Sequence, residues 1–267
     1  MNATWELTDL EFKVLCDEYR HGEIPDPFAF TSRTRIADDY EWEVAQARGD
    51  LWDRFGGELG TFGAALAKPD VFVTLQAWDD ADFDNPAART WVHALRQRAR
   101  GFVITQRPGE TLEHSGGFDI AECDPRALAD RVLGLVPFAR AGRLPDSAIP
   151  DPAAEAVPDR GVGSFVSMIS DNEDEYDAAH SAAFLATPAT RTGYVQIFQG
   201  RSKFGPRGRI EMGMLWRDLP DDGRYVIPLG VTSPSATGMG TKGMIQWVDE
   251  QIALVVARLD RNMETEE

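Results

Sequence analysis

Apolar and polar residues alternate with two different periods along this chain. Apolar residues three and four positions apart indicate amphipathic helices, whereas strict alternation indicates strands with one buried face. The clearest helical pattern lies near the C-terminus, in a helix for which Thr241 is the expected N-cap. Its apolar face carries Ile245, Val248, Ile252, Val255 and Leu259. Because both periods occur in each half of the chain, the pattern predicts an α+β protein.

Capping residues mark where helices are expected to begin. Thr8 and Glu11 have the spacing of a capping box, in which each side chain accepts a hydrogen bond from the other residue's backbone. Asp124 and Pro125 are expected to begin another helix. The inward side chains of that helix should be Leu128, Val132 and Leu135. Further helices are expected over residues 38–48, 59–66, 164–169 and 174–186.

Strand patterns occur in two groups. In the first half, strands are expected at residues 5–7, 71–77, 90–98, 102–105 and 118–122. In the second half they are expected at residues 193–199, 209–217 and 224–229. Each half therefore consists of helices, an antiparallel run of strands and one closing helix. Residues 64–75 also resemble residues 182–197, a likeness for which a duplication and a coincidence both account.

This order predicts one domain over residues 1–267, with a central, mainly antiparallel β-sheet shared by two related halves. The N-terminal half would comprise residues 1–136 and the C-terminal half residues 159–267. Between them, residues 137–158 contain five prolines among small and charged residues, which is typical of a linker or a boundary. The sequence GMGTKG at 238–243, which follows a Ser/Pro-rich loop, is expected to be a flexible connector with a helix cap.

Net charge excludes several classes of function. The chain has 27 Lys+Arg against 44 Asp+Glu, giving a formal net charge of −17. A field of this sign disfavours nucleic acids and anionic membranes, because both carry phosphate. No apolar run approaches the roughly 20 residues of a membrane helix, and no secretory leader is visible, so we expect a cytoplasmic protein without membrane insertion. Cys16 and Cys123 are expected to be buried free thiols.

Motifs for cofactors, metals and catalysis fail in detail. Lys242 in GMGTKG lacks the neighbours of a phosphate-binding loop, and the acidic run at 171–177 is explained by a helix start. Asp80, Asp82 and Asp84 alternate as in a calcium loop, but the required Gly and Glu are absent. We therefore expect no cofactor, no metal and no enzyme. The alternative is an enzyme or small-molecule-binding protein, whose site in the cleft between the halves would gather carboxylates with histidines. The histidines considered are His93, His114 and His180.

Two segments are candidates for binding a partner protein. Residues 191–217 carry six basic residues against Glu211 alone, and residues 78–84 place aromatic side chains among carboxylates. The candidate contacts of the acidic segment are Trp78, Asp80, Asp82, Phe83 and Asp84. Those of the basic segment are Arg201, Lys203, Phe204, Arg207 and Arg209. Charge can guide docking and aromatic side chains can anchor it, although a solvated hairpin tip explains the basic segment equally well.

Several stretches together resemble one known family. They are TWELTDLEF at 4–12, IPDPF at 24–28, ALAKPD at 65–70 and WRDLPDDGRYV at 216–226, followed by a Ser-Pro loop and a final amphipathic helix. The chain is similar to the EspG family, the cytosolic chaperones of type VII (ESX) secretion in mycobacteria and related actinobacteria. The Arg-rich, Lys-poor composition agrees with such a source.

The resemblance implies a central antiparallel sheet with two quasi-equivalent halves, flanked by helical bundles. It also implies that the protein binds the exposed helical tip of a PPE protein in a PE–PPE heterodimer and keeps it soluble for export. In the family this contact involves the central sheet and the second-half helices, and no cofactor or reaction is implied. A scaffolding subunit that acts as a homodimer is a further alternative.

Overall fold

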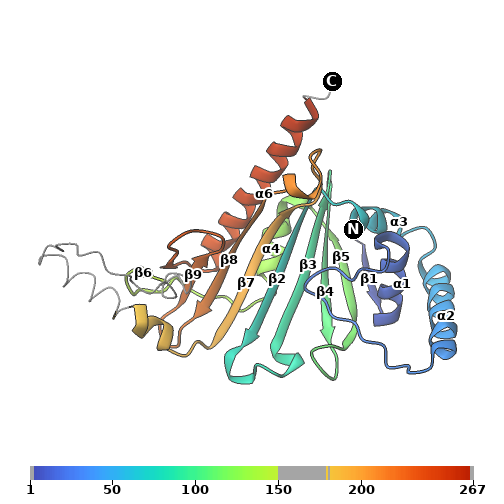
Figure 1. Ribbon diagram of the computed structural model, residues 1–267, viewed down its shortest axis with the longest axis horizontal. Helices are drawn as coiled ribbons and strands as arrows, with labels where there is room; N and C mark the ends of the chain where they lie inside the picture. The colour runs from blue at the N-terminus through green and yellow to red at the C-terminus, as the bar shows by residue number, and fades with distance from the viewer. Residues whose placement is uncertain (1–2, 150–178, 180, 265–267) are drawn as a thin grey trace, which may run out of the picture.

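Ten strands form one antiparallel sheet in the computed structural model, which describes residues 3–149, 179 and 181–264 (Figure 1). Their order across the sheet is β1-β5-β4-β3-β2-β7-β8-β9-β10-β6. The first five strands are β1 (Thr4–Leu7), β2 (Val71–Asp79), β3 (Arg89–Gln97), β4 (Arg100–Pro108) and β5 (Ser115–Cys123). The others are β6 (Ser147–Ala148), β7 (Arg191–Gln199), β8 (Glu211–Asp218), β9 (Arg224–Pro228) and β10 (Ser235–Gly238).

The two halves of the chain meet where β2 pairs with β7. Val71 faces Gln199 at one end of this pair and Asp79 faces Arg191 at the other. On one side the order is β2-β3-β4-β5-β1, and on the other side it is β7-β8-β9-β10-β6. Each side is thus a run of four successive strands with a short fifth strand outside, which gives the sheet an approximate twofold axis between β2 and β7. The predicted α+β fold with quasi-equivalent halves is confirmed.

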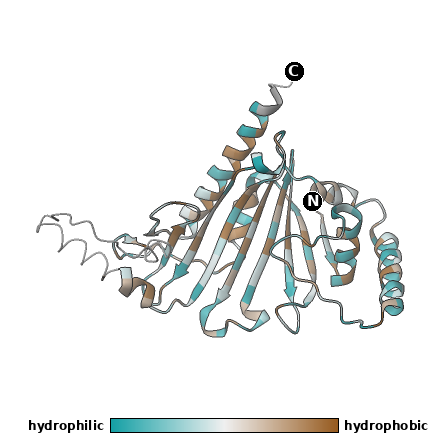
Figure 2. Cartoon of the chain, in the orientation of Figure 1, coloured by the Kyte–Doolittle hydropathy of each residue, from teal (hydrophilic) through white to brown (hydrophobic). Residues whose placement is uncertain are grey.

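Two helices cover one face of the sheet, α4 (Leu128–Leu133) and α6 (Thr241–Glu264). Alternate strand residues such as Val73 and Val195 pack against them, because side chains in a strand point to opposite faces in turn. From α6 this core receives Met244, Val248, Ile252, Val255 and Leu259. Figure 2 shows hydrophobic and hydrophilic bands alternating along α6, as expected for a helix packed on one side.

The opposite face is covered at its two sides. On the N-terminal side lie α1 (Asp9–Arg20), α2 (Ala37–Phe55) and α3 (Gly60–Ala67), around an aromatic core that includes Phe12, Phe62, Phe102 and Phe118. On the C-terminal side, helical residues 181–186 place Phe184 against Tyr225 of β9, with ring centroids 5.3 Å apart. The remaining short helices are η1 (Asp80–Asp82), η2 (Pro86–Ala88), η3 (Pro125–Ala127) and η4 (Pro206–Gly208).

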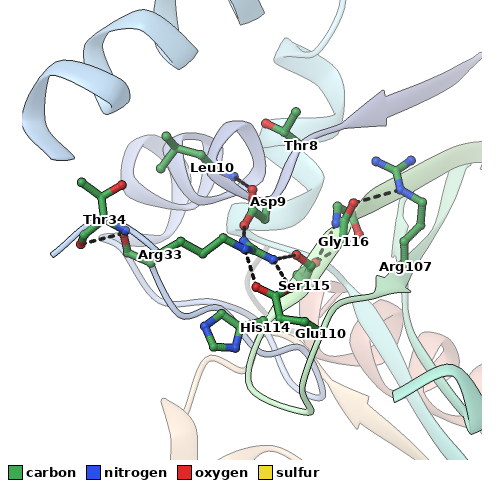
Figure 3. Close-up of polar contacts among 12 residues, drawn as sticks. Thr8, Asp9, Leu10, Arg33, Thr34, Arg107, Glu110, His114, Ser115 and Gly116 are labelled. Carbon is green, nitrogen blue, oxygen red and sulfur yellow. Dashed lines mark hydrogen bonds and ion pairs between the residues drawn. The ribbon is translucent and has the colours of Figure 1, made fainter. Parts of the chain in front are cut away.

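Arg33 fastens the segment between α1 and α2 to the rest of the N-terminal side (Figure 3). Its guanidinium donates to both carboxylate oxygens of Glu110, at 2.7 and 2.6 Å, and to the carbonyl oxygen of Ser115 at 2.9 Å, and it pairs with Asp9. The hydrogen bonds from Arg33 lower the pKa of Glu110 to about 2. One side chain therefore joins the α1–α2 segment, the start of α1 and the β4–β5 loop.

The capping predictions for Thr8 and Asp124 are confirmed. The Glu11 backbone N–H donates to the Thr8 hydroxyl at 3.1 Å and the Thr8 N–H donates to the Glu11 carboxylate at 2.8 Å. Asp124 likewise caps η3, which leads into α4. Cys16 and Cys123 are buried free thiols, as expected.

Three predictions about the strands and helices are wrong. Leu135 is 42% exposed, because α4 ends at Leu133 and the chain turns at Gly134. Thr241 is not the N-cap of α6, because the helix begins at Thr241 itself and the Thr241 hydroxyl accepts a hydrogen bond from the Ala139 N–H at 2.9 Å. The predicted apolar face of α6 does pack against the core, with Ile245 half-buried and Met244 added to it. The expected Ser/Pro-rich loop before residue 238 contains strand β10, which ends at Gly238 and pairs with β9 and β6.

The described part of the Pro-rich segment, residues 137–149, is hydrogen-bonded to the C-terminal half. The Arg224 N–H donates to the Arg140 carbonyl at 2.8 Å, the Thr241 N–H donates to the Ala139 carbonyl at 2.9 Å, and β6 pairs with β10. This part runs along the sheet as a draped segment. The expected helix at 164–169, the first part of the one at 174–186 (residues 174–178 and 180) and the acidic run at 171–177 lie outside the described residues.

Candidate partner-binding surface

The middle of the sheet has one face without a helix over it. Figure 1 shows β2 and β7 with α4 and α6 behind them and no described helix in front. We call the half-buried side chains on this front face of the two strands the open strip. The open strip consists of Phe72, Gln76, Trp78, Thr192, Tyr194, Gln196 and Phe198.

Aromatic side chains form both ends of the open strip. The rings of Phe72 and Phe198 stack across the β2–β7 pair, with centroids 4.7 Å apart and planes at 11°. At the other end Trp78 and Tyr194 meet edge to face, with centroids 6.2 Å apart. Aromatic rings held in place by neighbours lose little conformational freedom when a partner covers them, and they are common anchors of protein interfaces. The open strip is therefore suited to binding a protein surface with apolar side chains.

The acidic candidate loop adjoins the Trp78 end of the open strip and is held by Arg89. The Arg89 guanidinium donates to the carbonyl oxygen of Phe83 at 3.1 and 2.8 Å and lies 4.2 Å from the centroid of the Phe83 ring. Trp78 and Phe83 meet edge to face, with centroids 5.9 Å apart. The structure thus brings together the two aromatic residues predicted in this loop.

The carboxylates of the loop are exposed beside these rings. Asp80 accepts a hydrogen bond from the Thr192 hydroxyl at 2.8 Å, and Asp82 accepts one from the Asn85 amide at 2.6 Å. Asp84 is exposed, and Phe83 is 51% exposed. The loop therefore presents one exposed aromatic ring surrounded by negative charge, next to the open strip.

A buried histidine on β3, His93, packs against the Phe72 end of the open strip. His93 is 3% exposed, stacks on Phe72 with centroids 5.3 Å apart and donates from Nδ1 to the carbonyl oxygen of Asp26 at 2.5 Å. Burial lowers the pKa of His93 to about 4, so the ring is neutral at neutral pH. The pKa of Tyr194, which lies in the open strip on β7, is raised mainly by burial and to a smaller extent by the negative charge of Asp26.

The basic candidate segment does not form one patch. It folds into the β7–β8 hairpin, so Arg191 and Arg217 lie at the acidic-loop end of the sheet while residues 201–209 lie at the opposite end. Nine residues of β2 separate the two ends, about 30 Å of extended chain. The Arg217 guanidinium already makes hydrogen bonds within the protein, because it donates to the carbonyl oxygens of Phe184 at 2.9 Å and Thr187 at 2.6 Å. The two predicted surfaces are therefore separate.

Within the β7–β8 loop, the predicted residues have different surroundings. Arg201 forms an ion pair with Asp70 at 2.7 Å. Phe204 is 66% exposed, and the Lys203 amine lies 5.4 Å from the centroid of its ring. Arg207 and Arg209 are exposed. This loop remains a second candidate surface, at the Phe72 end of the sheet.

The described residues do not bring the histidines together. His93 is buried in the middle of β3, whereas His114 lies in the β4–β5 loop, where its Nδ1 is 2.7 Å from the Thr111 hydroxyl. His180 lies outside the described residues. A hollow of about 670 Å³ between β1, β5, β4 and α4 has carboxylates at its margin but no histidine. Among the described residues, no three His, Cys, Asp or Glu side chains are placed to hold a metal ion.

Comparison with known proteins agrees with this architecture. The sequence profile of the EspG family matches residues 8–239, which include both halves of the sheet. The chain belongs to the EspG family. A search of curated proteins by sequence found no match. Within the described residues of this EspG-family chain, no helix combines the length and the apolar character needed to cross a membrane.

A solved structure shows the same fold. It is the Mycobacterium tuberculosis type VII secretion system chaperone EspG5 in complex with a PE25-PPE41 dimer. The TM-score is 0.52, and the match covers 95% of this chain and 96% of that chain at 13% identity. At this identity the likeness establishes the fold of this EspG-family chain, and the open strip supplies the local geometry on which a function can be argued.

Proposed function

We propose that this EspG-family protein is a cytoplasmic chaperone of type VII (ESX) secretion. In this proposal it binds a PE–PPE heterodimer through the exposed helical tip of the PPE protein and keeps that tip soluble until export. Family membership supports the role, and the fold shared with EspG5, which was solved with a PE25-PPE41 dimer, supports the kind of partner. The observation that carries the proposal for this chain is the half-exposed aromatic strip in the middle of the sheet, over which no described helix lies.

The open strip has the chemistry that such a task requires. An apolar helical tip exposed to water tends to aggregate, and covering it with another apolar surface removes that tendency. Phe72, Phe198, Trp78 and Tyr194 provide such a surface, while Gln76 and Gln196 between them can hydrogen-bond to polar groups of the partner. Because these side chains stand on a rigid sheet, little conformational entropy is lost on binding.

In the same proposal the acidic loop sets orientation and specificity. Trp78 and Phe83 are the proposed anchors, and Asp80, Asp82 and Asp84 would favour partners with basic residues beside the tip. The loop with Arg201, Lys203, Phe204, Arg207 and Arg209 lies at the far end, so it would contact only a partner that spans the whole strip. Charge reversal at Arg207 and Arg209 tests whether the partner extends that far.

Co-expression with PE–PPE pairs from the same source, followed by affinity purification and size-exclusion chromatography, tests the proposal. The informative variant is Gln76→Arg, which places a long charged side chain in the middle of the open strip without touching the core. Gln246→Arg is the matched control, since Gln246 is exposed on α6 behind the sheet. We expect a cognate pair to co-purify with the wild-type chain and with Gln246→Arg, and to be lost or weakened at least tenfold with Gln76→Arg.

Two results would contradict the proposal in different ways. If no PE–PPE pair co-purifies at low salt, the chaperone role is wrong for this chain. If a pair co-purifies equally with Gln76→Arg and the wild type, the role stands but the open strip is not the contact surface. Circular dichroism and thermal unfolding of each variant establish that the fold is intact.

A further inference from the structure

The outer face of α2 exposes two tryptophans. Trp42 is 65% exposed and Trp52 is 50% exposed, whereas the other five tryptophans of the chain are buried or half-buried. Helix α2 lies at the outer edge of the molecule, away from the sheet (Figure 1). Aromatic side chains left in water on a helix face indicate a surface that another protein covers.

The two tryptophans flank small residues on one side of the helix. At 100° per residue, Trp42, Ala45, Gly49 and Trp52 share the side opposite to Ala47 and Leu51, which are buried against the protein. Ten residues separate the tryptophans, about 15 Å along the helix axis. These four residues therefore form a shallow surface with an aromatic ring at each end, which we call the seat.

Gly49 has no role in the fold that would explain its position. It lies in the interior of α2, where glycine costs about 1 kcal/mol relative to alanine, and a Cβ placed there would meet no atom within 4 Å. The missing side chain is thus not required by any contact within the described residues. Its effect is to let a partner backbone approach the helix closely between the two tryptophans.

Charge on this helix indicates what kind of partner fits. Five exposed carboxylates lie along α2, and none of them forms an ion pair with another described residue. They are Asp38, Asp39, Glu41, Asp50 and Asp53. The exposed basic residues of α2 are Arg48 and Arg54, and Arg54 is paired with Glu11. A second copy of the same face would bring like charges together, whereas a basic partner would be attracted.

We propose that the outer face of α2 is a docking surface for a basic amphipathic helix of another protein. The two tryptophans would contact the apolar stripe of that helix, and the backbone of the partner would cross α2 at Gly49. The Lys or Arg side chains of the partner would pair with carboxylates of α2. This surface is separate from the open strip. An EspG-family chaperone could therefore hold its cargo and a second, basic protein at the same time.

A designed peptide serves as the probe. It is an 18-residue amphipathic helix of lysine, alanine and leucine, and a second peptide with glutamate in place of lysine is the charge control. Binding is measured by calorimetry and by the blue shift of tryptophan emission as Trp42 and Trp52 are covered. We expect the lysine peptide to bind, its affinity to fall as salt is raised, and the glutamate peptide to bind at least tenfold more weakly.

Three variants separate docking from folding. Trp42→Ala and Trp52→Ala should each weaken binding of the lysine peptide at least tenfold, whereas Phe138→Ala, which removes another exposed ring elsewhere, should leave it unchanged. Gly49→Gln should block the seat and weaken binding at least tenfold without lowering the thermal unfolding temperature, since glutamine is a better helix former than glycine.

The proposal is overturned if both peptides bind equally, because the attraction would then be unspecific. It is also overturned if the tryptophan variants or Gly49→Gln bind the lysine peptide like the wild type. Sedimentation velocity of the protein alone supplies a further outcome. A dimer that Trp42→Ala dissociates would show that the occupant is a second copy, and the basic partner would be wrong.

Discussion

His93 makes the stability of this protein depend on pH in a window where few other side chains titrate. The ring is buried, and burial lowers its pKa to about 4 from an ordinary value of 6.5. The charge of nearby Arg20 acts in the same direction, while the hydrogen bond to the Asp26 carbonyl opposes both. The difference between the two pKa values corresponds to about 3 kcal/mol of folding free energy.

The sign follows from which state binds the proton. Below pH 6.5 the unfolded chain protonates this histidine, while the folded chain keeps it neutral down to about pH 4. Stability is therefore fully present above pH 6.5 and is lost as the pH falls toward 4, with a loss of about 2 kcal/mol by pH 5.0. Urea unfolding at pH 7.5, 6.5, 5.8 and 5.0 measures it, because most carboxylates titrate below this range.

A variant assigns the effect to one side chain. His93→Gln keeps a donor for the Asp26 carbonyl but cannot titrate, so its free energy of unfolding should vary much less between pH 7.5 and 5.0. His114→Gln is the control, since His114 is only half-buried in the β4–β5 loop, and it should retain the wild-type profile. The reasoning is refuted if the wild-type profile is flat over this range, or if His93→Gln shows the same slope as the wild type.

Further predictions concern the helix caps, a buried ion pair and the thiols. Thr8→Ala removes half of the capping box and should lower the free energy of unfolding by about 1 kcal/mol in urea titrations, with Thr8→Ser as the conservative control. Arg224, fully buried, donates to both carboxylate oxygens of Asp218 at 2.6 and 2.8 Å, so Arg224→Met should cost about 3–5 kcal/mol; a cost below 1 kcal/mol would show that the pair is dispensable. Burial raises the pKa of the Cys16 thiol to about 12, so this thiol should react with a disulfide reagent only after denaturation, and rapid labelling of the native protein would contradict its burial.

Local signals in the sequence predicted most of the secondary structure, because they act over a few residues. The capping box at Thr8, the alternation in β2 and the apolar stripe of α6 each depend on neighbours in the chain. Strand β10 was missed because its backbone pairs with β9 and β6, partners that its own residues do not indicate. Leu135 was misplaced because the apolar period continues past the point where α4 ends, at Leu133 with Gly134 as its C-cap.

The candidate surface was predicted only in part, because surfaces depend on how strands are folded together. The acidic loop was found from its composition, and its two aromatic residues do lie together. The basic residues of 191–217 are close in sequence but are divided between opposite ends of the sheet by the β7–β8 hairpin. The sequence does contain a pattern that indicates the open strip. Phe72, Tyr194 and Phe198 are aromatic residues at the strand positions that alternate with the core-facing ones.

The pairing of β2 with β7 has a consequence for how the chain is made. Each of its contacts joins residues more than 100 positions apart, so the two halves of the sheet cannot unite until most of the chain has left the ribosome. Until then β2 is an open strand edge rich in Val and Phe, the kind of edge to which other chains add. During its own synthesis, this protein passes through an aggregation-prone stage that ends only when the second half arrives.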